Sequence, residues 1–236
     1  MNLVLLTTDT PHHRYFAGKV AERFPFRGIL IETGRAVPPF ETHHAFEDER
    51  DAYERETLLA GRRLDLGEIA EAVRVDGIND PPSLEAMARF DADVAVVFGT
   101  RRLGPAMIAR ARRAFLNLHG GNPEKYRGLD SHLWAIYHED FGNLMTTLHK
   151  VDRDLDTGDI VARAPLALER GMPLSRLRAV NTNVCVSLVL EALDALTGGG
   201  TPASRPQARR GRYYSFMPAA LKEECKTKFE RHVGQR

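Results

Sequence analysis

The sequence has little cysteine and no excess of charge of either sign. Cys185 and Cys225 are its only cysteines, which is too few for a framework of disulfides and lacks the spacing of metal ligands. The 33 basic residues are balanced by 32 acidic ones, so no overall field favours nucleic acid or an anionic membrane. We therefore expect a protein of the reducing cytoplasm, with no nucleic-acid partner and no metal.

Long apolar runs and a leader peptide are also missing. No apolar run approaches the roughly 20 residues that span a bilayer, and Met1–Thr8 lacks the charged start of a signal peptide. We therefore expect a soluble chain with no membrane insertion. Its 236 residues suit a catalytic domain over residues 1–200 and a short C-terminal extension over residues 201–236, with Gly198–Gly200 ending the last helix of the domain.

Glycine is absent from the loop after the first predicted strand. Asn2–Thr7 is a continuous apolar run typical of a buried strand, His12–Phe24 has helical spacing, and Phe26–Ile31 is a second apolar run. This βαβ order predicts an α/β fold: a Rossmann-like, mostly parallel sheet flanked by helices, with a ligand crevice at the C-terminal ends of the strands. The loop Thr8–Arg14 has no Gly-x-Gly-x-x-Gly, so the dinucleotide-binding motif is absent.

The rest of the chain continues this alternation. Further strands are predicted at Val73–Asn79, Asp93–Gly99, Phe115–Gly120, Asn143–Val151 and Asp159–Leu168, and further helices at Ser83–Phe90, from Pro105, at Asp130–Glu139 and at Pro173–Leu196. Thr42–Leu66 is heavily charged with a thin apolar stripe, which predicts an exposed helix that is mobile or faces a partner. Its His43 and His44 point to different faces of such a helix, so we expect solvent-facing residues rather than metal ligands.

Polar side chains gather at the end of the strand in the stretch Ala114–Gly128. Asn117 and His119 share one face of that strand, because alternate residues of a strand point the same way. Gly120 and Gly121 then end it and allow a ligand to approach the backbone. The alternative to a functional site is a purely structural one, in which the strand belongs to the core and its two polar side chains form hydrogen bonds within the protein before a turn.

Asn117, His119 and Asp156 are the three groups that we expect in catalysis. An imidazole beside a carboxamide and within reach of a carboxylate suits general acid–base work on a carbonyl. The carboxamide and a protonated imidazole can both donate to a developing oxyanion. No serine or cysteine lies at a sharp elbow, so the chemistry indicated is direct attack of an amine on an activated acyl group rather than a covalent acyl-enzyme.

These motifs carry a family resemblance. Asn117-Leu118-His119, Lys125-Tyr126-x-Gly128, His149 and Leu155-Asp156-Thr157-Gly158 together resemble the transferases that use N10-formyltetrahydrofolate. That family includes glycinamide ribonucleotide formyltransferase, methionyl-tRNA formyltransferase and the sugar N-formyltransferases. The resemblance covers Asp93–Ile160 well and the flanking parts loosely.

The resemblance implies roles for these residues. Asn117 and His119 would polarise the formyl oxygen, and Asp156 would set the charge of the histidine and assist movement of the amine proton. N10-formyltetrahydrofolate would be the formyl donor, leaving as tetrahydrofolate, and no metal would be needed. The donor would be held, largely by backbone hydrogen bonds, at Phe98, Thr100, Arg101, Arg102, Leu103, Val151, Asp152, Leu155 and Asp156.

Departures from the family pattern narrow the acceptor. The family commonly has Pro-Ser-Leu-Leu-Pro after the histidine, where this chain has Gly120–Glu124. Because the first loop has no glycine for a phosphate, glycinamide ribonucleotide is disfavoured. The short C-terminal tail and the near-neutral charge likewise disfavour methionyl-tRNA. The chain then resembles the compact homodimeric sugar-nucleotide N-formyltransferases of O-antigen and lipopolysaccharide biosynthesis, which act on a 4-amino-4,6-dideoxy sugar such as GDP-perosamine.

Basic and aromatic groups near the same sheet edge are candidate contacts for such a nucleotide sugar. They are Thr8, His12, His13, Arg14, Asn122, Lys125, Tyr126 and Arg127. Arg14 and Lys125 could hold a diphosphate and Tyr126 could stack on a base or sugar, although each could equally be an ordinary surface charge or packing residue. His132 and His149 are interpreted as structural hydrogen-bonders. Tyr213 and Tyr214 could close the pocket or contact a second subunit.

Three other functions fit parts of the pattern. The acceptor could be another small amine, such as glycinamide ribonucleotide, a hydroxylamine or an amino acid. The chain could be a non-catalytic, nucleotide-binding Rossmann-like module with Asn117 and His119 as ligand contacts. A metal-dependent deacetylase or hydrolase using His119, His149 and Asp156 is a further possibility, which would require bound metal.

Overall fold

The computed structural model describes residues 1–197 and 200–235 and contains a seven-stranded sheet of order β3-β2-β1-β4-β5-β7-β8. Its strands are β1 (Leu3–Thr7), β2 (Phe26–Glu32), β3 (Ala72–Val75), β4 (Val94–Phe98), β5 (Ala114–His119), β7 (Met145–Lys150) and β8 (Ile160–Pro165). The first five are parallel, whereas β7 and β8 are antiparallel to their neighbours. The predicted Rossmann-like, mostly parallel sheet flanked by helices is confirmed.

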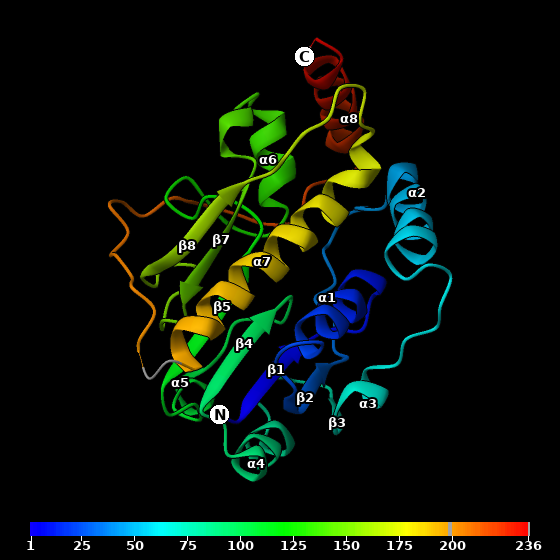
Figure 1. Ribbon diagram of the computed structural model, residues 1–236. Coiled ribbons are helices and arrows are strands. Elements are labelled where there is room, and N and C mark those ends of the chain that lie inside the picture. The colour runs from blue at the N-terminus through cyan, green and yellow to red at the C-terminus, as the bar shows by residue number, and fades with distance from the viewer. Residues whose placement is uncertain (198–199, 236) are drawn as a thin grey trace.

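Helices cover both faces of the sheet, which explains why its central strands are apolar throughout. Along β1, Leu3 and Leu5 face a core shared with α1 (Pro11–Ala21), α3 (Leu66–Ile69) and α7 (Leu177–Thr197). Val4 and Leu6 point to the opposite face, where α4 (Pro81–Phe90) and α5 (Pro105–Ile108) pack. Figure 1 shows α1 and α7 lying across the same face.

A third apolar cluster lies beyond the C-terminal end of the parallel strands. It joins α2 (Ala45–Tyr53), α6 (Ser131–Tyr137), η3 (Leu174–Arg176) and α8 (Ala219–Gly234), which gather at the upper end of the molecule in Figure 1. A separate two-stranded parallel sheet, β6 (Tyr126–Gly128) with β9 (Arg212–Tyr214), lies beside this cluster, and η2 (Phe141–Asn143) precedes β7. These elements place side chains at the edge of the sheet where a ligand crevice was predicted.

The charged segment 42–66 differs from its prediction. It forms α2 and a π-helical turn, η1 (Glu54–Leu58), before a loop leads to α3. Many of its charged residues are exposed, as predicted, but Phe46 is 4% exposed and Glu54 is fully buried, so one face of the segment packs against the protein. Burial is possible because Arg178 of α7 donates to both carboxylate oxygens of Glu54 at 2.6 Å, which compensates for loss of water. His43 is exposed, but His44 caps α2 by accepting a hydrogen bond from the Phe46 N–H.

Helix α7 corrects the prediction about the length of apolar runs. The helical run Leu174–Thr197 is long and apolar enough to cross a membrane by length and composition alone, with a mean hydropathy of 1.4 in its most apolar window. The expectation that no apolar run approaches this length was therefore wrong. Half of that window is buried inside the protein, where Leu188 and Leu193 pack against the sheet. Of the predicted glycine end at Gly198–Gly200, Gly198 and Gly199 lie outside the described residues.

Candidate active site

Strand pairing brings the three expected catalytic side chains together with a fourth. Asn117 on β5 lies opposite His149 on the antiparallel β7, and the Asn117 Nδ2 donates to His149 Nε2 at 3.0 Å. The turn after β7 returns Asp156 to the same place. Its Oδ1 lies 3.5 Å from both Asn117 Nδ2 and His149 Nε2, and its Oδ2 lies 3.5 Å from His119 Nδ1. One carboxylate therefore bridges two imidazoles and a carboxamide.

Asp156 is held as a buried anion. Burial opposes ionisation, but the neighbouring His119 charge and the hydrogen bond from the Gly128 N–H at 2.8 Å outweigh it and keep the pKa of Asp156 well below its usual range. Its backbone has the left-handed conformation, with φ of 55°, which is uncommon for L-residues but is adopted more readily by aspartate than by most others. This carboxylate is therefore suited to orient and stabilise a cationic group rather than to donate a proton.

Both ring nitrogens of His119 are engaged within the protein. Nε2 lies 2.8 Å from the backbone oxygen of Tyr126, so Nε2 must carry a hydrogen because a carbonyl can only accept. Nδ1 faces Asp156, and the side chain is nearly fully buried. A formyl oxygen can receive a hydrogen bond from this imidazole only by competing with one of these partners.

His149 and His132, which the sequence predicted to be structural hydrogen-bonders, differ in their surroundings. His149 Nδ1 lies 2.7 Å from the Lys150 carbonyl oxygen, so Nδ1 donates, and Nε2 is the ring nitrogen that faces the Asn117 amide. His149 thus orients the carboxamide as well as bonding the backbone. His132 lies 2.8 Å from the Met145 carbonyl oxygen, and burial lowers its pKa to about 4 despite that bond, so it is neutral at ordinary pH.

A cavity of about 420 Å³ opens in front of these groups at the C-terminal ends of the parallel strands. All of the predicted donor contacts line it, together with Asn117 and His119: Phe98, Thr100, Arg101, Arg102, Leu103, Val151, Asp152, Leu155 and Asp156. These residues belong to two loops, Phe98–Leu103 after β4 and Val151–Asp156 after β7. Glu32 holds the first loop in place, because it accepts hydrogen bonds from the Arg101 backbone N–H at 2.7 Å and from the Arg101 side chain at 2.8 Å.

The predicted acceptor contacts divide into two groups. His12 and His13 line the cavity, and burial keeps the pKa of each well below its usual value, so both present neutral rings. Six others are not among its lining residues: Thr8, Arg14, Asn122, Lys125, Tyr126 and Arg127.

These six side chains bond to other parts of the protein. Arg14 pairs with Asp9 at 2.5 Å. Lys125 and the Tyr126 hydroxyl both meet Asp140, at 3.1 and 3.0 Å. The remaining three bond as follows: Thr8 with His13 Nδ1, Asn122 with Asn143, and Arg127 with the carbonyl oxygens of Leu155 and Gly211.

Sequence reasoning missed the cavity wall opposite the two donor loops. Arg50 and Phe46 of α2 and Arg178 and Asn181 of α7 form it. Arg178 bonds Glu54 and Asp51 through Nε and Nη2. The residues of this wall come from α2 and α7, which are far apart in the sequence, and no local motif marks them.

Within residues 1–197 and 200–235, no group of three or more His, Cys, Asp or Glu side chains is arranged to hold a metal ion. Cys185 and Cys225 are both buried free thiols. The alternative of a metal-dependent hydrolase therefore gains no support from the described part of the chain.

Comparison with known sequences gives a consistent set of matches. A family model described as "Formyl transferase" matches residues 64–179. The methionyl-tRNA formyltransferase of Chlorobium chlorochromatii is 32% identical over 179 residues, covering 76% of this chain and 53% of that protein. That of Rhodopseudomonas palustris is 30% identical over 220 residues, covering 88% of this chain and 69% of that protein. The chain thus spans about half the length of the first relative.

Solved structures share the fold at low identity. A sugar N-formyltransferase from a Shewanella species superposes with a TM-score of 0.60 and 12% identity, covering 91% of this chain and 76% of that one. A formyltransferase from Anoxybacillus kamchatkensis, in complex with UDP-4,6-dideoxy-4-formamido-L-AltNAc and tetrahydrofolate, superposes with a TM-score of 0.53 and 18% identity, covering 91% and 86%.

Proposed function

This chain belongs to the formyl transferase family, and on that premise we propose that it transfers a formyl group from N10-formyltetrahydrofolate to the amine of a nucleotide-linked amino sugar. The observation that carries the proposal is the placement of Asp156 within 3.5 Å of His119, His149 and Asn117 at the floor of one cavity. An anion, an imidazole and a carboxamide in that arrangement suit acyl transfer by direct attack.

The donor is proposed to lie between the two loops that line one side of the cavity, Phe98–Leu103 and Val151–Asp156. Leu103 and Leu155 offer apolar contacts to a flat ring, and backbone groups of the two loops offer hydrogen bonds. This position brings the formyl group to Asn117 and His119 at the end of β5. Nothing in the step requires a metal.

In the proposed reaction an uncharged amine attacks the formyl carbon from the side of His12 and His13. A carbon–nitrogen bond forms, and the formyl oxygen takes up negative charge. The second Nδ2 hydrogen of Asn117, whose contact with Asp156 is long at 3.5 Å, is then available to that oxygen. The Nε2–H of His119 can also donate to it once it leaves the Tyr126 carbonyl oxygen. Collapse breaks the bond to N10, which takes up a proton as the amine loses one, and tetrahydrofolate leaves. Asp156 stabilises the charged His119 throughout.

The amino-sugar acceptor has support from the far wall of the cavity. We propose that Arg50 and Arg178 contact its phosphates, because they line the cavity whereas Arg14 and Lys125 do not. Names of structural neighbours include sugar N-formyltransferases and a complex with a 4-formamido sugar nucleotide. A 4-amino-4,6-dideoxy sugar such as that of GDP-perosamine is the specific substrate proposed. We further propose a cytoplasmic homodimer whose residues 1–200 form the catalytic domain, with residues 201–236 as an extension.

A second candidate acceptor is methionyl-tRNA. It is favoured by the names of the sequence relatives, but the formal net charge of +1 provides little attraction for an RNA backbone.

Acceptor screening tests the proposal. Purified protein would be incubated with N10-formyltetrahydrofolate and, in separate reactions, GDP- or UDP-linked 4-amino-4,6-dideoxy sugars, glycinamide ribonucleotide, hydroxylamine, amino acids and methionyl-tRNA, while release of tetrahydrofolate is followed. We expect turnover with a sugar nucleotide. Turnover with methionyl-tRNA alone would transfer the function to the second candidate, and folate binding without turnover on any amine would indicate a binding module.

A further inference from the structure

The Asp156 turn is held from outside the sheet by a residue of the C-terminal segment. Gln207 Nε2 lies 2.9 Å from the carbonyl oxygen of Asp156 and 3.0 Å from that of Gly158. Both partners are carbonyls, so the orientation of the amide is fixed, with nitrogen toward the turn. These two hydrogen bonds act on the residue whose left-handed backbone directs the carboxylate at His119 and His149.

The same side chain leaves its own oxygen unsatisfied. Gln207 Oε1 is buried and has no hydrogen-bond partner among residues 1–197 and 200–235. A buried acceptor without a partner costs stability. Within the described part of the chain, the contacts of this amide are therefore the two hydrogen bonds from its nitrogen to the turn.

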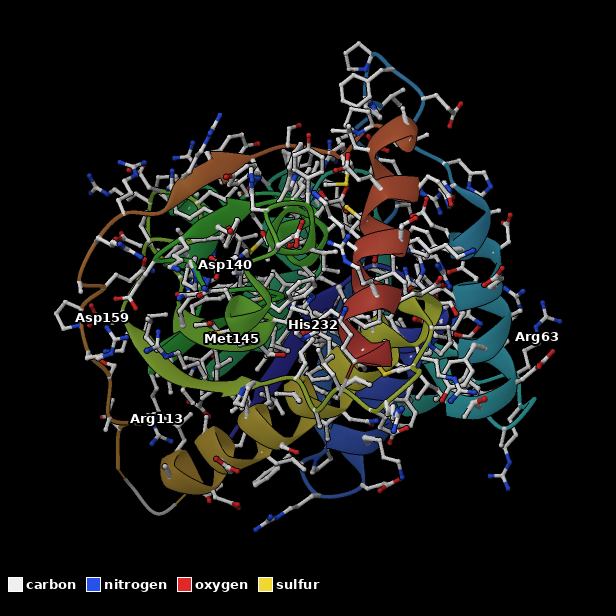
Figure 2. The ribbon with its side chains drawn as sticks, turned by 90° about the horizontal axis from the view of Figure 1, so that it is seen from above. Arg63, Arg113, Asp140, Met145, Asp159 and His232 are labelled. Atoms are coloured by element: carbon white, nitrogen blue, oxygen red, sulfur yellow. The ribbon has the colours of Figure 1, made fainter. Side chains whose placement is uncertain are left out.

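Glu124 anchors the segment that carries Gln207. Its carboxylate accepts hydrogen bonds from the Arg205 side chain at 2.9 Å and from the Ala208 backbone N–H at 2.6 Å, on either side of Gln207. Arg205 also exchanges two backbone hydrogen bonds with Ile160 of β8. In Figure 2 this orange segment passes along the side of the molecule where Asp159 is labelled and continues to β9. The segment therefore fastens the turn before β8 to the loop that follows His119.

We propose that Gln207 is a positioning residue for Asp156 in formyl transfer. This rests on the function proposed above, and it places a functional residue within 201–236, which sequence reasoning treated as an extension. Without the two hydrogen bonds, the left-handed turn loses its support and the carboxylate moves relative to His119. Because misplacement by about 1 Å can cost on the order of a hundredfold, kcat should fall even though Gln207 does not contact substrate.

Three variants test this proposal. Gln207→Met keeps the length of the side chain and removes both donors, and we expect kcat to fall by about tenfold to a hundredfold with little change in KM for the acceptor. Gln207→Glu puts a carboxylate against two carbonyls at neutral pH and should be at least as impaired. Once protonated it gains one donor, so its activity relative to wild type should rise as pH falls. Ser204→Ala is the control, because Ser204 bonds Asp159 rather than the Asp156 turn.

A second readout does not depend on turnover. The ring N–H resonances of His119 and His149 should shift in Gln207→Met and stay in place in Ser204→Ala, with thermal unfolding showing that each variant is folded. If wild type transfers no formyl group to any amine but the resonances shift, the proposed function fails and the positioning role stands. Wild-type kcat and unshifted resonances in folded Gln207→Met, or a Gln207→Glu activity ratio independent of pH, would overturn the positioning role.

Discussion

Tyr126 accepts a hydrogen bond from His119 through its backbone oxygen, at 2.8 Å from Nε2. Tyr126 begins β6, which pairs with β9, so the partner of the candidate catalytic imidazole belongs to a fixed backbone rather than to a mobile side chain. A formyl oxygen that binds His119 must replace this carbonyl or the contact with Asp156. The ring is therefore oriented before substrate arrives, which reduces the entropic cost of ordering it in the transition state.

Removal of the imidazole of His119 or of the charge of Asp156 should greatly slow catalysis and leave binding of the folate donor intact. In His119→Ala and in Asp156→Asn we expect kcat and kcat/KM to fall together, by about a hundredfold to ten-thousandfold, because both groups act in the transition state. Titration calorimetry with the folate should give a Kd near that of wild type. Asp159→Asn, outside the cavity, is the matched control. Near-normal turnover would remove the altered residue from the catalytic set.

The carboxamide should contribute less. Asn117→Ala removes one oxyanion donor, so we expect kcat to fall by about a hundredfold. Asn117→Ala also removes the hydrogen bond to His149 Nε2. His149→Phe measures the effect of losing that hydrogen bond alone, because it leaves the Asn117 amide in place. A smaller effect in His149→Phe than in Asn117→Ala is expected if the amide acts on substrate directly. Equal effects would mean that Asn117 works only through His149.

Acceptor affinity discriminates between two sets of basic residues. Sequence reasoning favoured Arg14 and Lys125, whereas the cavity presents Arg50 and Arg178. We expect Arg50→Met to raise KM for the nucleotide sugar by about tenfold to a hundredfold, with an unchanged Kd for the folate, because one charge-assisted contact contributes roughly 1.5–3 kcal/mol.

Arg178 is tested only together with its buried partner. Arg178→Met alone would leave Glu54 without a counter-charge, so the double change with Glu54→Gln avoids unfolding. Lys125→Met serves as the comparison. A larger rise in KM in Lys125→Met than in the arginine variants would restore the assignment made from sequence.

Acid should weaken the attachment of the C-terminal segment through Glu124. Hydrogen bonding with Arg205 lowers the pKa of Glu124 from 4.5 to about 2. Because the folded-state pKa is the lower one, this carboxylate stabilises the fold above pH 4.5, and that contribution is lost as pH falls towards 2. Denaturant unfolding of wild type and Glu124→Gln should give a difference in free energy that is largest near neutrality and shrinks below pH 4.5. A difference that does not vary with pH would contradict this.

The centre of the site was predictable because each of its members belongs to a pattern that is local in the sequence. Asn117 and His119 alternate along one strand, Gly120 and Gly121 end it, and Asp156 lies in a turn with a recognisable motif. Local periodicity and motif spacing capture such an arrangement. The sheet was predictable for the same reason, since continuous apolar runs mark strands that are covered on both faces.

The outer parts of the site depend on contacts that no local pattern encodes. Arg178 and Glu54 are far apart in the chain, and the Glu54 carboxylate becomes compatible with burial only when it is paired, so charge alone did not predict that Glu54 is buried. Strands β6 and β9 are three residues each, too short for an alternating pattern. The start of α4 was also misplaced, because Ser83 bonds the Gly77 carbonyl oxygen while Asp80 takes the N-cap position.

The parallel pairing of β6 with β9 has a consequence for how the chain folds. It joins Tyr126, next to the candidate site, to Arg212 near the C-terminal end of the sequence, and such distant partners meet late because closing a long loop costs entropy before the contact is made. The parallel strands, the β7–β8 hairpin and the Asp156 turn can form first from nearer contacts. During refolding, circular dichroism of the sheet should therefore recover before enzymatic activity, which must await docking of the last part of the chain.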